Sequence, residues 1–335
     1  MRQMSRGSQS AGASQEKRSL VENIRRLAAK EAVALLIALI LLIAAFSTAD
    51  PNFATVRNTV NIARSVGVLG ISATGVTIGL IGGVFDLSIA SVADLASVVT
   101  VMAYLQMGLS PNIAMLMGLT AGMGCGLLNG IIVTRFRINP IIATLGTAGI
   151  FRGMAFLVSG GLSHAVGSAG FRWLGRSRLL GIPSPVIIMG IVMLLGYVIL
   201  RYSRFGRHTY AVGGNPVASR LAGINVDRHR LYLFVLISFC ASLGGLVLLS
   251  KLGTALPNAA AGTELDTIAA AILGGTALAG GGGTIQGTLV GVLILGTLRN
   301  GLVINNVNPY WQEITSGIAL IIAVAIDRLR SGGYR

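Results

Sequence analysis

Residues 201–230, RYSRFGRHTYAVGGNPVASRLAGINVDRHR, form the longest polar interruption between two hydrophobic blocks of the sequence. The stretch holds six arginines and two of the three histidines. After two consecutive glycines, Asn215 is suited to cap a helix, and Pro216 fits the first helical position, where no backbone amide hydrogen is needed. Gly223 is suited to end the same helix. The pattern predicts a short helix over 215–224, flanked by basic residues.

Two interpretations of this stretch follow from its residues. A short helix whose small apolar face contains Ala218 and Leu221 is suited to dock into another protein. A basic loop between two membrane spans also sets the orientation of a membrane protein, because arginine and lysine accumulate on the cytoplasmic side. The residues alone leave both interpretations open.

The composition indicates a membrane protein with several spans. Of the 335 residues, 53% are apolar and 11% are charged, and the mean hydropathy is +0.77. Soluble domains carry about 25% charged residues. The net charge of +15 is spread over segment ends, which is typical of membrane topology and does not predict nucleic-acid binding. The two cysteines lie in apolar runs without metal-ligand spacing, so we expect neither a metal site nor a disulfide.

The apolar runs predict an all-α integral membrane protein of about ten transmembrane helices. The expected spans cover residues 31–47, 65–84, 85–107, 112–134, 140–159, 183–200, 231–249, 266–278, 287–303 and 311–326. The second span contains six glycines, which permit close helix packing or a break in the helix. We expect segment 50–64 to lie along the membrane interface. Residues 1–30 are expected to form a cytoplasmic tail with an amphipathic helix over 19–30, and residues 328–335 a second cytoplasmic tail.

The distribution of basic residues predicts the orientation. An even number of spans places both termini on the same side of the membrane. With both termini in the cytoplasm, 18 basic residues lie inside and six outside, as the positive-inside rule requires.

A short internal similarity predicts an inverted repeat. The run GLLNG at 126–130, followed by Asn139-Pro140, is similar to TLRNG at 297–301, followed by Asn308-Pro309. In the ten-span topology the two runs cross the membrane in opposite directions. The repeat would relate spans 2–5 to spans 7–10, an arrangement found in transporters whose path lies where the repeats meet.

The chain resembles the ribose/simple-sugar family of ABC importer permeases over residues 50–327. The resemblance rests on FDLSIAS at 85–91, INPIIATLGTAGIFRG at 138–153, FGRHTYAVGGNPVASRLAGINV at 205–226, and ELDTIAAAILGGTALAGGGGTIQGTLVGVLILGTLRNGL at 264–302. It departs from the family at Val84-Phe85, at Ala90 and at Pro216, and the first two changes stiffen a junction that is pliant in the family.

The resemblance implies that residues 31–327 are the permease domain of an ATP-driven importer in a bacterial inner membrane, and that residues 201–230 carry a coupling helix that docks into an ATP-binding subunit. By matching positions, the docking residues would be Gly213, Gly214, Asn215, Pro216, Ala218, Arg220, Leu221, Gly223 and Ile224. The implied partners are that subunit, a periplasmic or lipid-anchored sugar-binding protein, and a second permease copy, identical or paralogous. The partner subunit would bind ATP and Mg²⁺; this chain has no GxxxxGK[ST] phosphate-binding motif and no catalytic role.

Sugars require groups that match hydroxyls, so polar uncharged residues on the glycine-rich spans are candidates for the solute path. The candidates are eight uncharged residues and one carboxylate, Asp86: Thr74, Thr77, Asp86, Ser88, Asn129, Thr144, Thr147, Thr276 and Asn300. Charged residues within spans either line a watery path or pair structurally, and the sequence leaves this open for Asp86, Asp94, Arg152 and Arg299.

The main alternative is an ion-coupled secondary transporter for a small polar solute. Such a carrier would also explain the inverted similarity and the charges within the spans, but it would not need the docking helix. A membrane-embedded enzyme is disfavoured, because no His/Asp/Glu cluster or nucleophile-base pair lies on neighbouring spans.

Overall fold

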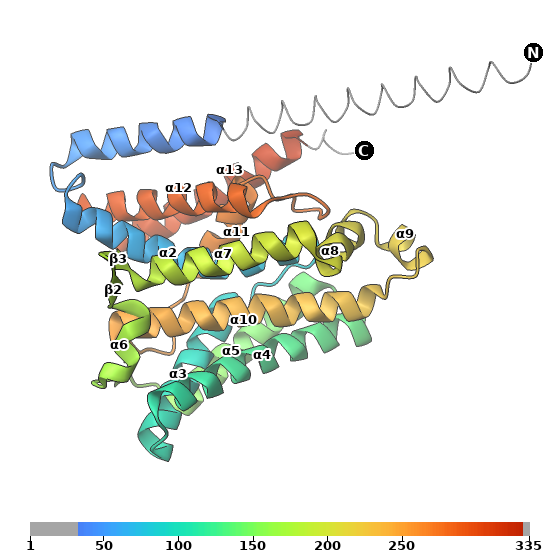
Figure 1. Cartoon of the computed structure of the whole chain (residues 1–335), viewed down its shortest axis with the longest axis horizontal. Coiled ribbons are helices and arrows are strands. Elements are labelled where there is room, and N and C mark those ends of the chain that lie inside the picture. Colours follow the sequence, from blue (N-terminus) through green and yellow to red (C-terminus); the bar gives the residue numbers. More distant parts are fainter. Residues whose placement is uncertain (1–32, 331–335) are drawn as a thin grey trace, which may run out of the picture.

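The computed structural model describes residues 33–330, and Figure 1 shows them as a bundle of helices whose axes run roughly side by side. Within residues 33–330, seven helices are long and apolar enough to cross a membrane: α2 (Val56–Ile81), α3 (Ile89–Met107), α4 (Pro111–Arg135), α5 (Pro140–Ser159), α7 (Ser184–Tyr202), α10 (Val226–Leu252) and α12 (Ile285–Ile304). They confirm the predicted all-α integral membrane protein.

The remaining three expected spans are shorter. Two are apolar helices, Val33–Ala49 and the Tyr310–Ala325 part of α13 (Pro309–Arg330). The third is α11 (Thr263–Leu273), whose 11 residues extend about 16 Å along the helix axis. Because the hydrocarbon core of a bilayer is about 30 Å thick, α11 crosses about half of it.

In two polar segments the structure differs from what the sequence led us to expect. Residues 56–64, which were expected along the membrane interface, form the first turns of α2. Thr55 caps this helix by accepting a hydrogen bond from the backbone of Asn58 at 3.3 Å. Residues before the expected docking helix form a further helix, α8 (Arg204–Gly214), capped by Ser203.

The predicted helix over 215–224 is present as α9 (Pro216–Leu221). The predicted amphipathic helix over 19–30 lies outside the described residues.

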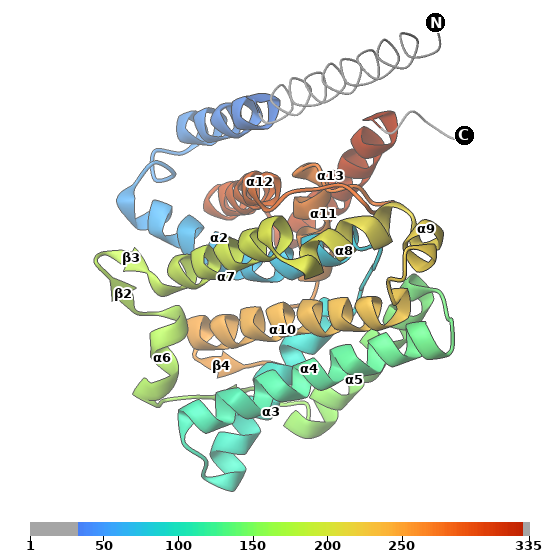
Figure 2. The ribbon, with the colours of Figure 1, turned by 45° about the vertical axis from the view of Figure 1, so that its right-hand side comes forward.

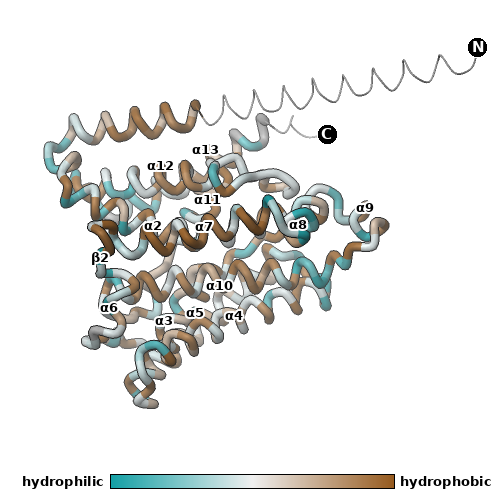
Figure 3. The backbone as a smooth tube through the Cα atoms, in the orientation of Figure 1, coloured by the Kyte–Doolittle hydropathy of each residue, from teal (hydrophilic) through white to brown (hydrophobic). Residues whose placement is uncertain are grey.

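The two ends of the bundle differ. Figures 1 and 2 place α9 at one end, which we call the α9 end, and α6 (Ala169–Gly175) with two small two-stranded sheets at the other, the α6 end. In one sheet β1 (His164–Ala165) pairs with β4 (Thr254–Ala255), and in the other β2 (Arg178–Leu179) forms a hairpin with β3 (Ile182–Pro183). Figure 3 shows hydrophilic segments around α8 and an apolar α7 between the two ends.

The core of the bundle is the antiparallel contact of α2 and α10, two largely buried helices. A column of glycines on α2 faces side chains of α10. A Cβ atom added at Gly75 would lie 2.7 Å from Cys240 Cβ, and one at Gly82 would lie 2.2 Å from Leu233 Cδ1. Glycine therefore permits the close backbone approach on which helix association in membranes depends.

The remaining helices pack around this pair with an internal symmetry. Helix α2 packs against α11 and α12, whereas α10 packs against α3 and α4. The helices fall into two groups of four, α2–α5 and α10–α13. Within each group the second helix also contacts the fourth, α3 with α5 and α11 with α13. Each first helix therefore packs against the second and third helices of the other group. Because α2 and α10 are antiparallel, this is the packing that an inverted repeat of α2–α5 and α10–α13 would produce.

Substitutions on α4 test the packing against α10. A Cβ atom at Gly126 would lie 2.6 Å from the backbone oxygen of Phe234, whereas Gly124 has no neighbouring atom within 4 Å. We expect Gly126→Ala to lower the free energy of unfolding by about 1–3 kcal/mol, the usual effect of overpacking, and Gly124→Ala to leave it nearly unchanged. Thermal unfolding in detergent measures both variants, and equal stabilities would contradict the described contact.

Candidate functional site

Helix α9, to which the sequence assigned docking, is a short exposed helix held by its own cap. The Asn215 side chain accepts a hydrogen bond from the backbone of Ala218 at 2.9 Å, as the sequence predicted for an N-cap. Gly223 adopts a left-handed φ of 83° just after the helix, a conformation that favours glycine. The side chains of Val217 and Leu221 are 64% and 87% exposed.

The residues assigned to docking from the sequence lie together around this helix. Gly213 and Gly214 end α8, Asn215 is the cap, and Pro216, Ala218, Arg220 and Leu221 lie in α9, with Gly223 and Ile224 directly after it. Arg220 forms an ion pair with Asp227 at the start of α10, at 3.1 Å. Both side chains are about half exposed, so the pair adds little stability but links α9 to α10.

A cavity of about 620 Å³, with a mostly apolar lining that also carries polar and charged side chains, lies between α2, α10, α11 and α12, in the half of the bundle nearer the α6 end. This volume is within the range of about 300–1,000 Å³ that small-molecule sites occupy. Its polar lining consists of Asn61, Arg64, Ser65, Ser72, Lys251, Thr263, Asp266, Thr267, Arg299, Asn300 and Gln312. Hydroxyl, amide and charged groups around one open cavity are suited to bind a hydroxyl-rich solute.

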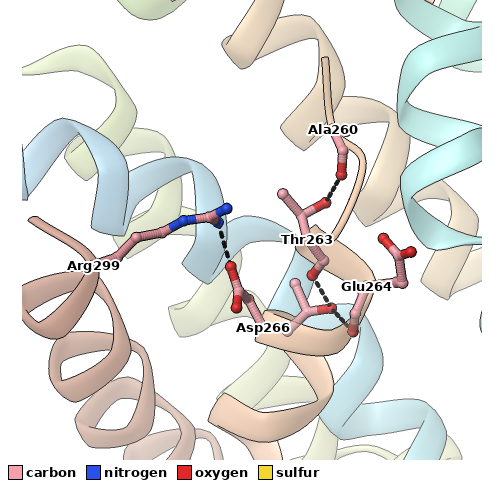
Figure 4. Close-up of polar contacts among 6 residues, drawn as sticks. Ala260, Thr263, Glu264, Asp266 and Arg299 are labelled. Carbon is pink, nitrogen blue, oxygen red and sulfur yellow. Dashed lines mark hydrogen bonds and ion pairs between the residues drawn. The ribbon is translucent and has the colours of Figure 1, made fainter. Parts of the chain in front are cut away.

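An ion pair lies at the inner wall of this cavity. Arg299 of α12 donates a hydrogen bond to the Asp266 carboxylate in the first turn of α11, and Figure 4 shows the two side chains directed toward each other. The Asp266 side chain is 5% exposed, whereas that of Arg299 is 42% exposed. Glu264, one residue before Leu265, directs its carboxylate away from Arg299 (Figure 4). Arg299 therefore neutralises a buried carboxylate while still facing the cavity.

Two further cations and an amide pair complete the wall. Lys251 donates to the Ser65 hydroxyl at 3.0 Å, and the Arg64 Nε atom is buried without a hydrogen-bond partner among the described residues. Asn58 and Asn300 exchange two side-chain hydrogen bonds, at 2.8 and 3.0 Å. This amide pair fixes the C-terminal end of α12 to the start of α2.

Of the nine path candidates named from the sequence, only Asn300 lines the cavity. Thr74 and Thr77 donate to backbone oxygens of their own helix, and Thr77 also bonds Thr288 at 2.7 Å. Thr276 is buried, and its hydroxyl has no partner among the described residues.

Four other candidates form a closed polar cluster between α3, α4 and α5. Ser88 donates from its backbone and its hydroxyl to Asp86, at 2.7 and 2.6 Å, and Asn129 donates to the Ser88 hydroxyl at 2.8 Å. Thr144 accepts from the backbone of Leu87 at 3.1 Å. All four are buried, as is Thr147, which donates to the Thr144 backbone. Their role in the solute path stays a prediction.

The remaining charged residues within the spans are placed differently. Asp94 accepts a hydrogen bond from the backbone of Ala260 at 2.9 Å, which anchors the segment before α11 to α3. Arg152 is exposed on α5 and close enough to Asp94 to attract it. Of the four charges left open from the sequence, Arg299 lines the cavity and pairs at the same time.

The cavity residues that the sequence missed are basic, amide and hydroxyl side chains. Arg64 and Lys251 were counted as charges outside the membrane, and Asn61 and Gln312 lie near the ends of their spans. These four side chains line one cavity only because all of them lie beside the short helix α11.

Comparison with known proteins places this geometry in a family. Residues 58–324 match the family described as branched-chain amino acid transport system / permease component. The chain belongs to this permease family. The ribose import permease protein RbsC of Escherichia coli K12 is 41% identical over 298 residues, which cover 87% of this chain and 92% of RbsC.

Two further relatives agree with this assignment. RbsC of Bacillus subtilis 168 is 38% identical, over 88% of this permease and 91% of the relative. The L-arabinose transport system permease protein AraH of Escherichia coli K12 is 35% identical, over 85% and 87%. The resemblance to simple-sugar permeases that the sequence predicted is confirmed.

The contribution of the Arg299–Asp266 ion pair to the stability of this permease can be measured. Arg299→Gln leaves the buried Asp266 carboxylate unpaired, so we expect a loss of about 2 kcal/mol, less than the 3–5 kcal/mol typical of fully buried pairs because Arg299 is partly exposed. Adding Asp266→Asn removes the unpaired charge and should restore most of the stability. Thermal unfolding in detergent measures this; a double variant no more stable than Arg299→Gln would contradict the pairing.

Proposed function

We propose that this permease is the transmembrane subunit of an ATP-driven ABC importer for a monosaccharide or related polyol. The observation that carries the proposal is the exposed helix α9, at the opposite end of the bundle from a cavity of small-molecule size that carries polar and charged side chains. The relatives' names, ribose import permease and L-arabinose transport system permease, support a pentose or similar sugar as the solute.

The partners follow from this assignment. An ATP-binding subunit would dock at α9 and bind ATP and Mg²⁺, so that this chain takes part in transport but not in hydrolysis. A periplasmic or lipid-anchored sugar-binding protein would deliver the solute to the α6 end. A second permease copy, identical or paralogous, would complete the membrane unit, with both termini in the cytoplasm of a bacterial inner membrane.

The arrangement supports an alternating-access mechanism. The cavity lining on α2 reaches from Asn61 to Ser72 and stops well before the end of the helix at Ile81. Beyond Ser72, α2 is buried and packed against α10. A solute entering from the α6 end would therefore meet the cavity first and a closed core behind it.

The rival proposal is an ion-coupled carrier. Charged residues within the spans and the repeat-like packing of α2–α5 and α10–α13 fit such a carrier equally well. A self-sufficient carrier gains nothing from exposing an apolar side chain such as Leu221 at the tip of a basic loop, which favours the ABC assignment.

The docking helix provides the first test. A negative charge at Leu221 would desolvate in the interface without a partner, so Leu221→Glu should abolish co-purification of the ATP-binding subunit from the native host. The control is Leu180→Glu, because Leu180 is 95% exposed in the hairpin at the α6 end and should retain the subunit. A Leu221→Glu chain that still carries the subunit, or an unaltered chain that transports alone, would contradict the proposal.

The cavity provides the second test. Asn61 is exposed and lines the cavity, so Asn61→Trp should narrow it without disturbing the core. We expect uptake of ribose or L-arabinose by the reconstituted complex to fall by about tenfold or more, while the ATP-binding subunit still co-purifies. The matched control Asn112→Trp changes an exposed residue at the start of α4. Equal uptake by the two variants would exclude this cavity from the path.

A further inference from the structure

Three distant segments meet backbone to backbone at the α9 end. They are the end of α2, the end of α8, and the loop 274–284 between α11 and α12. Their contact consists of Gly83, Gly213, Gly214, Gly280 and Gly281, which we call the glycine junction. A hydrogen bond closes it, since the backbone nitrogen of Gly281 donates to the backbone oxygen of Ile81 at 2.8 Å.

Three members of the glycine junction, Gly213, Gly280 and Gly281, leave no room for a side chain. A Cβ atom at Gly213 would lie 1.8 Å from the Ile81 oxygen, and one at Gly281 would lie 2.7 Å from the Gly214 Cα atom. Real Cβ atoms essentially never approach a neighbour within 3.0 Å. Gly280 and Gly281 also adopt left-handed φ angles of 92° and 77°, a second reason for glycine at both positions.

Side-chain hydrogen bonds hold α8 in place against this contact. The Tyr210 hydroxyl donates to the backbone oxygen of Gly283 at 2.9 Å, and burial raises the pKa of Tyr210 above its ordinary value. On the other side of α8, Thr209 bonds the His229 ring at 2.9 Å. The junction is thus fixed to both the loop and α10.

The chain connections of the junction lead to both functional regions. Gly214 directly precedes the Asn215 cap of α9. Ile81 is the last residue of α2, and loop 274–284 ends at Thr284, which caps α12. Helices α2 and α12 both line the solute cavity, so one contact joins the docking helix to two cavity walls.

We propose that the glycine junction transmits the docking state of α9 to the solute cavity, with Gly213 and Gly281 as positioning residues for transport. A flexible side chain between these segments would absorb a displacement by changing rotamer. Close-packed backbones joined by a hydrogen bond move together, because packed interfaces shift between discrete arrangements and do not deform continuously. This inference rests on the proposed function, in which an ATP-binding subunit docks at α9.

Two neighbouring glycines provide a matched test. Gly281→Ala forces a Cβ atom into Gly214 at a left-handed φ, whereas a Cβ atom at Gly282 would make an ordinary contact of 3.5 Å with Ala277 and its φ lies outside the left-handed region. Each variant carries Asn61→Cys as a reporter in the cavity, since the two native cysteines are buried. The complete complex is reconstituted, and labelling by a membrane-impermeant maleimide is measured with and without ATP and Mg²⁺.

The expected result separates coupling from assembly. In the Gly282→Ala complex, ATP should change the labelling rate at residue 61 by about tenfold, the scale of a typical coupling between sites. In the Gly281→Ala complex this change should be lost, although the ATP-binding subunit co-purifies in the same amount. An equal response to ATP in both variants, or no response in the unaltered junction, would overturn the proposal.

Two further measurements complete the test: a check that the complex assembles, and a replacement variant. If no ATP-binding subunit co-purifies with the unaltered chain, the proposed function itself fails, whereas an assembled complex with equal responses sinks only the junction. If Gly281→Ala does not fold, Tyr210→Phe replaces it, with the exposed Tyr202→Phe as control. Loss of the hydrogen bond to Gly283 should reduce the ATP response by about fivefold, and an unchanged response would overturn the inference.

Discussion

The close antiparallel contact of α2 and α10 is the constraint on which the rest of this permease depends. Between helices in a bilayer there is little hydrophobic driving force, because lipid tails are as apolar as leucine, so close packing of small residues holds them together. Gly75, Gly79 and Gly82 remove side chains from one face of α2, and Ile237, Cys240 and Leu233 of α10 fill that space. Each helix then contacts the second and third helices of the opposite group of four.

This central contact also separates the two proposed functional regions, α9 and the cavity. Near the α9 end, α2 and α10 are in close contact, and the glycine junction joins α2 to α8 and to the loop before α12. Near the α6 end, the half-helix α11 leaves space that a full span would have filled. Side chains such as Arg299 and Lys251 line that space. A membrane protein tolerates non-helical backbone at this depth only where protein or a cavity covers it, and the segment before α11 is covered by α3 through the bond from Ala260 to Asp94.

The sequence predicted the helices well and the cavity poorly, for separate physical reasons. Hydropathy located the long spans, since lipid requires each to satisfy its own backbone, and the Asn215-Pro216 pair marked the start of α9 because capping is local chemistry. The path candidates were chosen by residue type. Hydroxyls such as those of Thr74 and Thr77 satisfy themselves on their own helix, and residue type does not show which groups face an open space. The meeting of Gly213 with Gly281 was equally invisible, because it depends on how distant segments pack.

The internal symmetry explains why the two regions lie at opposite ends. Each group of four begins with a long buried helix followed by a break, at residues 82–88 after α2 and at residues 253–262 after α10. Because α2 and α10 are antiparallel, the first break lies at the α9 end and the second toward the α6 end. The first is packed against α8 and holds the closed cluster of Asp86, Ser88 and Asn129. The second contributes Ala259, Ala260 and Ala261 to the wall of the cavity. The two breaks occupy equivalent places in the repeat, but the first is packed closed and the second borders the open cavity. Alternating access needs such an asymmetry, because a carrier must be sealed at one end while its site is reached from the other.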